Sequence, residues 1–337
     1  MKGKKMKKNR VRLGIVGATG LVGRTFLEVI EEKKLDFSEI RLFASEKSVG
    51  KALKCGEQMW KVQALSEEGF QDLDYVLFSA GAAVSGKWAP LAVRSGAYVI
   101  DNSSRWRTDP ECALIVPEIN PDDYAGKSKI ISNPNCSTIQ SVMALKPLDD
   151  AYRLKSVSYT TYQSVSGAGQ KGIDDFLRGK ENRKMAFFPH DISRNLIPEI
   201  DAPAKEGYTK EEIKMVEETR KILHRPDLNV SATCVRVPLE RTHGVVVQCV
   251  FRDVPDVDEA RKRLRAFPGI VVVDDLSRHV YPLAERAKGN DLVYVGRIRK
   301  DLACANGLLL FVVSDNIRKG AASNAVQILE YLMKKNR

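Results

Sequence analysis

The sequence predicts an α/β chain of two domains, one with a parallel β-sheet and one of the α+β type with a mixed or antiparallel sheet. The chain has 337 residues, which is more than one hydrophobic core usually covers. Residues 11–136 alternate short apolar runs with helical patterns, whereas long β-rich segments dominate residues 137–315. A helix of about 316–337 ends the chain and could return to the first domain.

The periodicity of apolar residues places the elements of both domains. Short apolar runs indicate strands buried on both faces in the first domain, and longer alternating runs indicate a sheet covered on one face in the second. Strands are expected at 11–17, 40–45, 74–80, 97–104, 129–132, 154–166, 232–253, 292–302 and 307–315. Helices are expected at 20–34, 84–96, 136–148, 171–180, 210–223, 256–267 and about 316–335.

The net charge of +11 is concentrated at the N-terminus. Residues 1–10 carry six Lys and Arg and no acid, so six of the eleven charges lie there and +5 remains for residues 11–337. We interpret residues 1–10 as a basic, disordered tail rather than a nucleic-acid-binding arm. The short apolar run that follows ends in glycines without a cleavage signal, which indicates a strand and turn rather than a signal peptide. We expect no nucleic-acid partner and no membrane partner.

The motif GATGLVG, residues 17–23, follows a predicted strand and opens a predicted helix. In this context glycines bring the backbone close to a dinucleotide pyrophosphate, and the helix N-terminus offers its free N–H groups to the phosphates. The spacing is GxxGxxG rather than GxGxxG, so the strand–turn–helix context carries the argument. It favours a Rossmann-type dinucleotide-binding domain over a purely structural turn.

The residues after the second predicted strand bear on the choice of cofactor. An acidic side chain there would bind a ribose 2′-hydroxyl and favour NAD, whereas cationic and hydroxyl side chains would accept a 2′-phosphate and favour NADP. Glu46 suits NAD, and Ser45, Lys47 and Ser48 suit NADP. We expect NADP, with use of NAD left open.

One of the six cysteines, Cys136, lies at a predicted helix N-terminus in the motif NPNCST. The helix dipole and free N–H groups stabilise a thiolate there, which is the nucleophilic form. Packing is the default role of a cysteine, and it suits Cys234 and Cys249 in their strand patterns. None of the six forms a CxxC pair or has zinc-ligand spacing with a histidine, so we expect no metal site and free thiols in a reducing cytoplasm.

A nucleophilic thiol needs a proton acceptor, and the chain has four histidines. His243 lies in RVPLERTHG, just before an apolar strand, and Arg236 lies seven residues earlier. An arginine and a histidine there could fix a substrate carboxylate and shuttle a proton. On composition alone, a surface or structural role remains the default for each histidine, and sequence alone does not bring His243 to Cys136.

Taken together, these motifs resemble the aspartate-semialdehyde dehydrogenase family over nearly the whole length of the chain. So many matches in order are far more specific than any single motif. The matching segments are VGATGLVG, FSAGAAVSGKWAP, VIDNSSRWR, LIVPEIN, NPNCSTIQ, SVSGAG, EEIKMVEETRKI, SATCVRVPLERTHG, YVGRIRKDL and SDNIRKGAASNAVQI.

The resemblance implies a catalytic set and a substrate set. Cys136 would be the nucleophile, His243 the acid/base, and Gln163 would orient the acyl intermediate. Arg236 would hold the substrate α-carboxylate, and Glu211 its amino group.

The resemblance also implies a phosphate site and a set of cofactor contacts. The phosphate site would consist of Arg107, Asn135 and Lys214. Glu46 departs from the small neutral residue that is common in the family, which weakens the expectation of strict NADP use. The cofactor contacts would be Gly17, Thr19, Gly20, Leu21, Val22, Ser45, Lys47, Ser48, Ser166, Gly167 and Asn316.

The implied reaction is the reversible reductive dephosphorylation of L-aspartyl 4-phosphate to L-aspartate 4-semialdehyde through a thioester on Cys136. It serves the biosynthesis of lysine through diaminopimelate, of threonine and of methionine. The family is dimeric or tetrameric through its second domain, so we expect a cytoplasmic homodimer or homotetramer whose other partners are the small-molecule substrates and phosphate.

Two rival interpretations remain at this stage. A related acyl-phosphate reductase, such as N-acetylglutamyl-phosphate reductase, or a glyceraldehyde-phosphate dehydrogenase would share the chemistry. Glu211 favours the aspartyl enzyme, because a free amino group requires a carboxylate partner. A non-catalytic dinucleotide-binding protein whose tail contacts nucleic acid would not need Cys136, Gln163 and His243 together.

Overall fold

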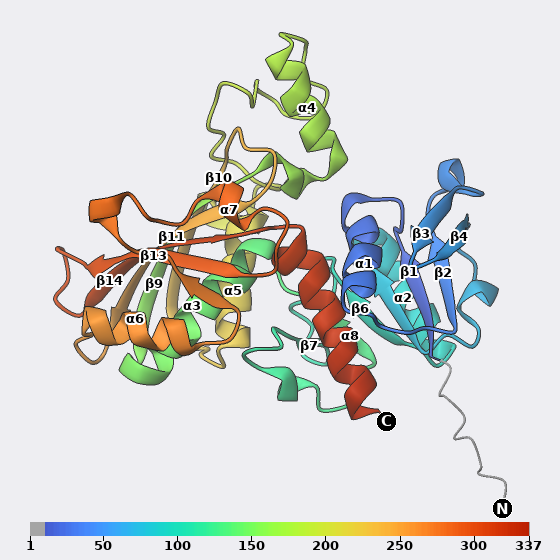
Figure 1. The fold of residues 1–337 in the computed structure, drawn as a ribbon, viewed down its shortest axis with the longest axis horizontal. Coiled ribbons are helices and arrows are strands. Elements are labelled where there is room, and N and C mark those ends of the chain that lie inside the picture. Colours follow the sequence, from blue (N-terminus) through green and yellow to red (C-terminus); the bar gives the residue numbers. More distant parts are fainter. Residues whose placement is uncertain (1–10, 337) are drawn as a thin grey trace, which may run out of the picture.

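The structure is a computed structural model, and residues 11–336 of it are described. The basic tail predicted for residues 1–10 lies outside the described residues. Two β-sheets occupy opposite sides of the molecule, and the C-terminal helix α8 (Ser323–Lys335) runs between them (Figure 1). No helix within residues 11–336 is long and apolar enough to cross a bilayer.

The first sheet has eight strands in the order β3-β4-β2-β1-β5-β6-β8-β7, all paired in parallel except the hairpin β3–β4. Its central strands are fully buried, which explains why they are short continuous apolar runs. The strands are β1 (Arg12–Val16), β2 (Glu39–Phe43), β3 (Ala52–Cys55), β4 (Gln58–Gln63), β5 (Tyr75–Phe78), β6 (Tyr98–Asp101), β7 (Ala113–Leu114) and β8 (Ile130–Ser132). The helices α1 (Leu21–Glu32) and α2 (Ala82–Arg94) connect its parallel strands.

The second sheet is mixed and has the order β10-β9-β11-β14-β13-β12. The outer pairs β10–β9 and β12–β13 are parallel, and the three inner pairs are antiparallel. The strands are β9 (Leu154–Gln163), β10 (Asn229–Arg236), β11 (His243–Phe251), β12 (Ile270–Val272), β13 (Val293–Lys300) and β14 (Gly307–Ser314). The helices are α3 (Cys136–Tyr152), α4 (Gln170–Lys180), α5 (Lys210–Ile222), α6 (Val257–Ala266) and α7 (Ala284–Ala287).

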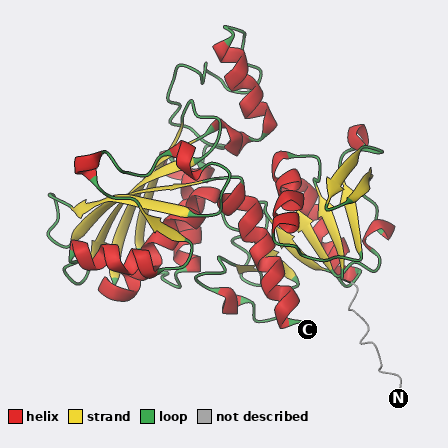
Figure 2. Ribbon diagram, in the orientation of Figure 1, coloured by secondary structure: helices red, strands yellow, loops and turns green. Residues whose placement is uncertain are grey.

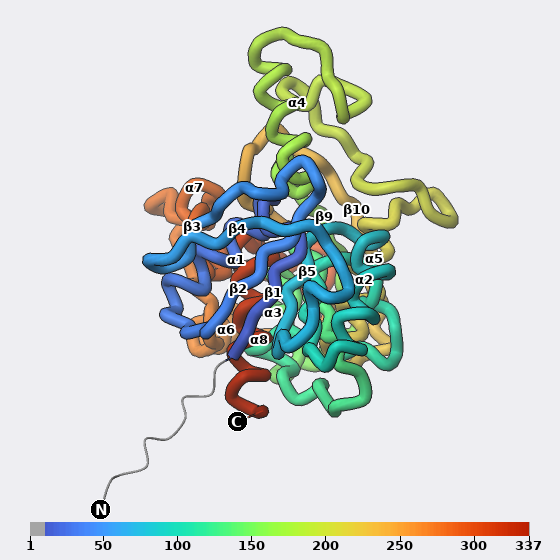
Figure 3. Tube along the Cα trace, turned by 90° about the vertical axis from the view of Figure 1, so that its right-hand side faces the viewer, coloured from blue at the N-terminus to red at the C-terminus, as the bar shows by residue number. Residues whose placement is uncertain are grey.

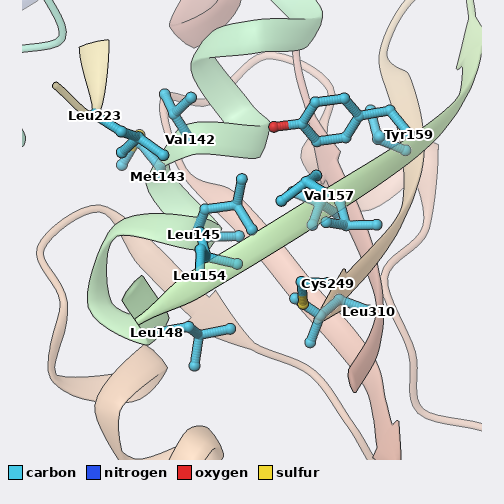
Figure 4. Packing of buried hydrophobic residues seen from close by; sticks show 14 of the residues in the cluster. Val142, Met143, Leu145, Leu148, Leu154, Val157, Tyr159, Leu223, Cys249 and Leu310 are labelled. Atoms are coloured by element: carbon cyan, nitrogen blue, oxygen red, sulfur yellow. The ribbon is translucent and has the colours of Figure 1, made fainter. Parts of the chain in front are cut away.

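Helices α3, α5 and α6 cover one face of the second sheet (Figure 2). Alternate residues of β9 point into this layer, so Val157 and Tyr159 pack against Val142 and Leu145 of α3 (Figure 4). Burying a large apolar side chain of this kind contributes about 1.5–3 kcal/mol. The packing fixes the axis of α3, and therefore the position of its first residue, Cys136.

The C-terminal helix packs on the first sheet. Leu329 and Leu332 of α8 belong to the same apolar cluster as Leu13, Phe26 and Ile30 of β1 and α1. A π-helical turn, Arg318–Ala322, precedes α8 and carries the chain back from β14. On these contacts we propose the division expected from the sequence, with residues 11–136 and 316–337 in one domain and residues 137–315 in the other.

Several features of the fold were not expected from the sequence. Strands β7 and β12 and helix α7 are too short to give a periodic pattern, and residues 237–242 divide the expected strand 232–253 into β10 and β11. The hairpin β3–β4 is mostly exposed, so its apolar content is too low to mark it as sheet. Residues 164–209 leave the second sheet as an excursion that contains α4 and stands above both domains (Figure 3). Its own apolar cluster is small and includes Phe176 and Ile192, so no long periodic pattern identifies it.

Candidate active site

A cavity of about 570 Å³ lies between the two domains. One wall follows the carboxyl ends of β5, β6 and β8, where parallel sheets collect ligand-binding residues. The opposite wall comes from the second domain and from the 164–209 excursion. Eleven of the predicted site residues line the cavity: Val22, Arg107, Asn135, Cys136, Gln163, Ser166, Gly167, Glu211, Lys214, Arg236 and Asn316.

Cys136 is the first residue of α3 and is partly exposed to the cavity. The side-chain oxygen of Asn135 caps this helix by accepting from the N–H groups of Ser137 at 2.9 Å and Thr138 at 3.2 Å. Burial and the nearby Glu211 carboxylate raise the pKa of the Cys136 thiol to about 11, although two arginines and the Ser137 N–H act in the opposite direction. The thiolate stabilisation expected from the helix N-terminus is therefore outweighed when the cavity holds no substrate.

Two of the other cysteines are structural by position. Cys234 and Cys249 lie in β10 and β11 and are fully buried in the core of the second domain, where burial raises the pKa of each thiol. All six cysteines are free. Within residues 11–336, no group of three His, Cys, Asp or Glu side chains is arranged to hold a metal ion.

His243 begins β11 and is fully buried next to the cavity. Its Nδ1 accepts from the backbone N–H of Ser164 at 3.1 Å, so the neutral ring carries its proton on Nε2. Nε2 has no hydrogen-bond partner among the described residues. Burial, with the positive charge of Arg236, lowers the pKa of His243 to about 3. The ring is therefore neutral near pH 7.

A glycine lies between the cavity and the side chains of His243 and Arg236. A Cβ atom at Gly167 would lie 3.4 Å from Nε2 of His243 and 2.6 Å from Nη1 of Arg236. Arg236 is the last residue of β10, and its Nη1 donates to the carbonyl oxygen of Ser164 at 2.8 Å. A larger residue at 167 would therefore displace the Arg236 guanidinium.

Glu211 is the centre of a buried hydrogen-bond network. Its Oε1 accepts from Nδ2 of Asn135 at 2.8 Å and from Nε2 of Gln163 at 3.2 Å. Its Oε2 lies 3.2 Å from Nζ of Lys214, which also contacts Asp201 at 2.6 Å. Burial acts to raise the pKa of Glu211, but Lys214 and the two amides outweigh it and lower that pKa. Glu211 is thus an ionised carboxylate at the cavity wall.

The local sequence explains the position of this network. Thr209 caps α5 in a capping box with Glu212, which fixes the first turn of the helix. Glu211 and Lys214 lie three residues apart and therefore share one face of that turn. Gln163 is the last residue of β9 and is 1% exposed, so its amide must be hydrogen-bonded where it is.

The glycine turn forms the cofactor side of the cleft. Gly17 has a φ of +85° and a Cβ atom there would lie 2.5 Å from the carbonyl oxygen of Ser79. A Cβ atom at Gly23 would lie 2.1 Å from the carbonyl oxygen of Gly17. Helix α1 begins at Leu21, and its N-cap Gly20 makes no side-chain hydrogen bond to it. The first turn of α1 therefore fits a bound pyrophosphate, because no side chain caps its N–H groups. In the glycine turn itself, the N–H groups of Gly17 and Ala18 donate to the carbonyl oxygen of Phe43.

The predicted 2′-phosphate contacts follow β2. Ser45 and Lys47 are exposed, as is Glu46, whereas Ser48 is buried with its hydroxyl 3.5 Å from that of Thr19. On the other side of the cleft, the side-chain oxygen Oδ1 of Asn316 accepts from the hydroxyl of Ser166 at 3.3 Å and from the backbone N–H of Thr242 at 2.9 Å. Seven predicted cofactor residues do not line the cavity itself: Gly17, Thr19, Gly20, Leu21, Ser45, Lys47 and Ser48.

Two family models match the chain. Residues 12–127 match the semialdehyde dehydrogenase NAD binding domain, and residues 145–319 match the semialdehyde dehydrogenase dimerisation domain. An aspartate-semialdehyde dehydrogenase of Aquifex aeolicus is 49% identical over 333 residues, which cover 96% of this chain and 98% of that protein. The chain belongs to the aspartate-semialdehyde dehydrogenase family.

Solved structures of aspartate-semialdehyde dehydrogenases have the same fold. Aspartate semialdehyde dehydrogenase II from Vibrio cholerae, complexed with ASA, superimposes with a TM-score of 0.93 at 42% identity and covers 97% of this chain and 99% of that chain. The enzyme from Candida albicans with NADP superimposes with a TM-score of 0.76 at 27% identity and covers 97% and 99% of the two chains. The predicted family, fold class and enzyme class, an oxidoreductase acting on aldehydes, are therefore confirmed.

Several residues in or behind the cavity of this aspartate-semialdehyde dehydrogenase family member were not predicted from the sequence. Lys171 and Phe187 reach it from the excursion and form a cation–π pair, with the ammonium 3.9 Å from the ring centroid. Asp201 reaches it before α5, and Glu218 lies behind Arg107. Only Glu218 had a usable signal, because it lies seven residues after Glu211 and so falls on the same face of α5.

Proposed function

We propose that the protein is an NADP-dependent aspartate-semialdehyde dehydrogenase that reduces L-aspartyl 4-phosphate to L-aspartate 4-semialdehyde through a thioester on Cys136. The observation that carries this proposal is the shared cavity. Cys136, at the start of α3, faces the same space as Gln163, Glu211 and Arg236, and the uncapped cofactor turn adjoins it. The same cavity is lined by Arg107 and Lys214, which suit an anionic phosphate.

The charges of the cavity match the proposed substrate. Glu211 is an ionised acceptor for the ammonium group, and Arg236 offers the rest of its guanidinium to the α-carboxylate. Pairing of Glu211 with a substrate ammonium would also offset the negative charge that raises the pKa of Cys136. Substrate binding would thus favour the nucleophilic thiolate in the same step that orients the carbonyl group.

In the reductive direction, Cys136 loses its proton to water as the substrate binds. The thiolate sulfur then forms a bond to the carbonyl carbon, and phosphate leaves with the bonding electron pair. Arg107 and Lys214 stabilise the charge of the departing phosphate. When bound, the nicotinamide cofactor would supply the hydride that reduces the thioester. His243 holds a proton at Nε2 that can hydrogen-bond to the carbonyl oxygen as charge develops there. Collapse of the thiohemiacetal breaks the carbon–sulfur bond and releases the semialdehyde.

The test is the formation of reduced nicotinamide from aspartate semialdehyde and NADP, with and without phosphate. The intact protein is expected to turn over only with phosphate, because phosphate must release the acyl group from Cys136. Turnover that does not depend on phosphate would contradict the phosphorylating reaction. No turnover with this substrate in the folded protein would contradict the function.

The proposed use of NADP rests on Ser45, Lys47 and Ser48 after β2, with NAD use open because Glu46 lies among them. The solved Candida albicans enzyme with NADP supports the same choice. The ratio of kcat/KM for NADP to that for NAD tests it, and a ratio near or below one would contradict it. The proposed reaction places the enzyme in the cytoplasmic synthesis of lysine, threonine and methionine.

We further propose that the protein forms a homodimer or homotetramer through the face of the second sheet opposite α3, α5 and α6, where α7 packs beside Val313. Val246, Leu309 and Phe311 lie on this face and are only partly buried. The match of residues 145–319 to a dimerisation domain supports this surface. Sedimentation of the full chain is expected to give a dimer or tetramer, and a monomer at micromolar concentration would contradict the proposal.

A further inference from the structure

Helix α5 carries four charged side chains along one face. Glu211, Lys214, Glu218 and Lys221 follow one another at spacings of three and four residues, which places them on a single stripe. The first two belong to the proposed substrate and phosphate sites. The other two lie behind the cavity, and the proposed reaction gives them no part.

Glu218 uses both oxygens of its carboxylate. The residue is 1% exposed. Its Oε1 accepts from Nη1 of Arg107 at 3.0 Å, and its Oε2 accepts from the backbone N–H of Asn135 at 2.6 Å. The carboxylate therefore joins two of the three residues that we assign to the phosphate site.

The Arg107 guanidinium is held by three acceptors. Besides the bond to Glu218, Nε donates to the carbonyl oxygen of Asn133 at 2.9 Å, and Nη2 donates to that of Asn102 at 3.0 Å. A guanidinium has five N–H donors in a rigid fork, so one remains on each terminal nitrogen. Because Arg107 lines the cavity, these two donors are available to bind an oxyanion at two points.

Lys221 holds the main chain of the same segment. Its Nζ donates to the carbonyl oxygens of Arg107 at 2.8 Å, Asp109 at 2.7 Å and Cys112 at 2.9 Å. All three ammonium donors are thus used on one loop of the first domain. Helix α5 therefore fixes Arg107 twice, by its side chain through Glu218 and by its backbone through Lys221.

We infer that Glu218 is a positioning residue for phosphate, which sets the Arg107 guanidinium and the Asn135 segment so that both face the oxyanion. This inference rests on the proposed function. A carboxylate suits the task because it accepts at both oxygens. A glutamine of the same shape has one acceptor and would leave either Arg107 or the Asn135 N–H opposite an NH₂ group.

The experiment compares Glu218→Gln with Glu217→Gln in the full-chain enzyme. Glu217 is the exposed neighbour on the same helix and loses the same charge in the control. Calorimetry measures the binding of inorganic phosphate, and steady-state kinetics measures KM separately for phosphate, semialdehyde and NADP. In Glu218→Gln, the Kd and KM for phosphate are expected to rise by about tenfold or more, because a charge-assisted bond to Arg107 is lost. The other two KM values and the control are expected to stay within about twofold.

Unchanged phosphate binding in folded Glu218→Gln would overturn the inference, and so would an equal rise in all three KM values, which a merely structural carboxylate would produce. If Glu218→Gln does not fold, Glu218→Asp replaces it. That variant keeps the charge but withdraws both oxygens by one methylene, so the same selective loss is expected. Calorimetry needs no turnover. If the intact protein binds phosphate but does not turn over, the proposed reaction alone is contradicted. If the intact protein does not bind phosphate, the inference is contradicted.

Discussion

The units β1–α1 and β8–α3 of the first sheet have the same strand–turn–helix order but differ at the N-terminus of the helix. Gly20 caps α1 without a side-chain hydrogen bond and is exposed. Asn135 caps α3 through two hydrogen bonds and is 6% exposed. The first helix N-terminus leaves its N–H groups for an external anion, whereas the second uses two of them internally and presents a side chain, Cys136.

The difference shows that a helix N-terminus does not by itself activate a thiol. At Cys136, burial and Glu211 raise the pKa of the thiol to about 11 against the influence of Arg107, Arg236 and the Ser137 N–H. The surrounding charges therefore decide the protonation state, and the substrate would change those charges. At the glycine turn, by contrast, the backbone conformation alone prepares the site.

The largest effect is expected from removing the nucleophile of the second unit. Cys136→Ser should lower phosphate-dependent turnover by about a thousandfold or more, because a hydroxyl is a far weaker nucleophile than a thiolate. Binding of NADP, measured by fluorescence titration, should change by less than about twofold, because the cofactor turn is untouched. Turnover within about tenfold of the parent would show that Cys136 is not the nucleophile of the reaction.

The second-largest effect should come from adding a side chain to the glycine turn of the β1–α1 unit. Gly17→Ala introduces a side chain at a φ of +85° with a Cβ atom 2.5 Å from the Ser79 carbonyl oxygen. The free energy of unfolding should fall by about 2 kcal/mol, and the KM for NADP should rise by about tenfold. Gly50→Ala is the matched control, because Gly50 has a φ of +82° with nothing within 4 Å of the added Cβ. An equal rise in KM for both variants would show that backbone strain, rather than the turn, causes the loss.

A smaller effect is expected from Glu211, and it concerns the pKa of the Cys136 thiol. Glu211 is negative and raises the pKa of Cys136, so Glu211→Gln should lower that pKa below the parent value of about 11. At pH 8 the thiolate fraction, and with it the rate of alkylation by iodoacetamide, should rise about threefold to tenfold. From pH 7 to pH 10, below the parent midpoint, the ratio of the rates of variant and parent gives the change in pKa, and Glu217→Gln serves as the control. A midpoint that stays the same or moves upward would assign the raised pKa to burial alone.

The smallest effect concerns the choice of cofactor. Lys47→Ala should lower kcat/KM for NADP by about threefold and leave that for NAD unchanged, because an exposed ion pair with a 2′-phosphate contributes little. Glu46→Gln should instead raise the ratio of kcat/KM for NADP to that for NAD. Equal effects on both cofactors in Lys47→Ala would remove this residue from the 2′-phosphate site.

Motifs with a local context were readable from the sequence. The glycine turn and the start of α3 each depend on a few adjacent residues, and strand–turn–helix order places both at one edge of the sheet. Lys171, Asp201 and Glu218 were missed, because their places depend on distant segments. Glu218, for example, contacts Arg107, 111 residues away. The raised pKa of Cys136 was missed for the same reason, since it arises from burial and from Glu211 rather than from the helix that carries the thiol.

The central claim, a thioester on Cys136, is tested most directly by mass spectrometry of the full-chain protein. The protein is mixed with aspartate semialdehyde and NADP without phosphate, quenched in acid and digested. The Cys136 peptide is expected to gain one aspartyl group, which disappears when phosphate is added before the quench. An unmodified Cys136 peptide together with reduced cofactor, or an aspartyl group on another residue, would contradict it.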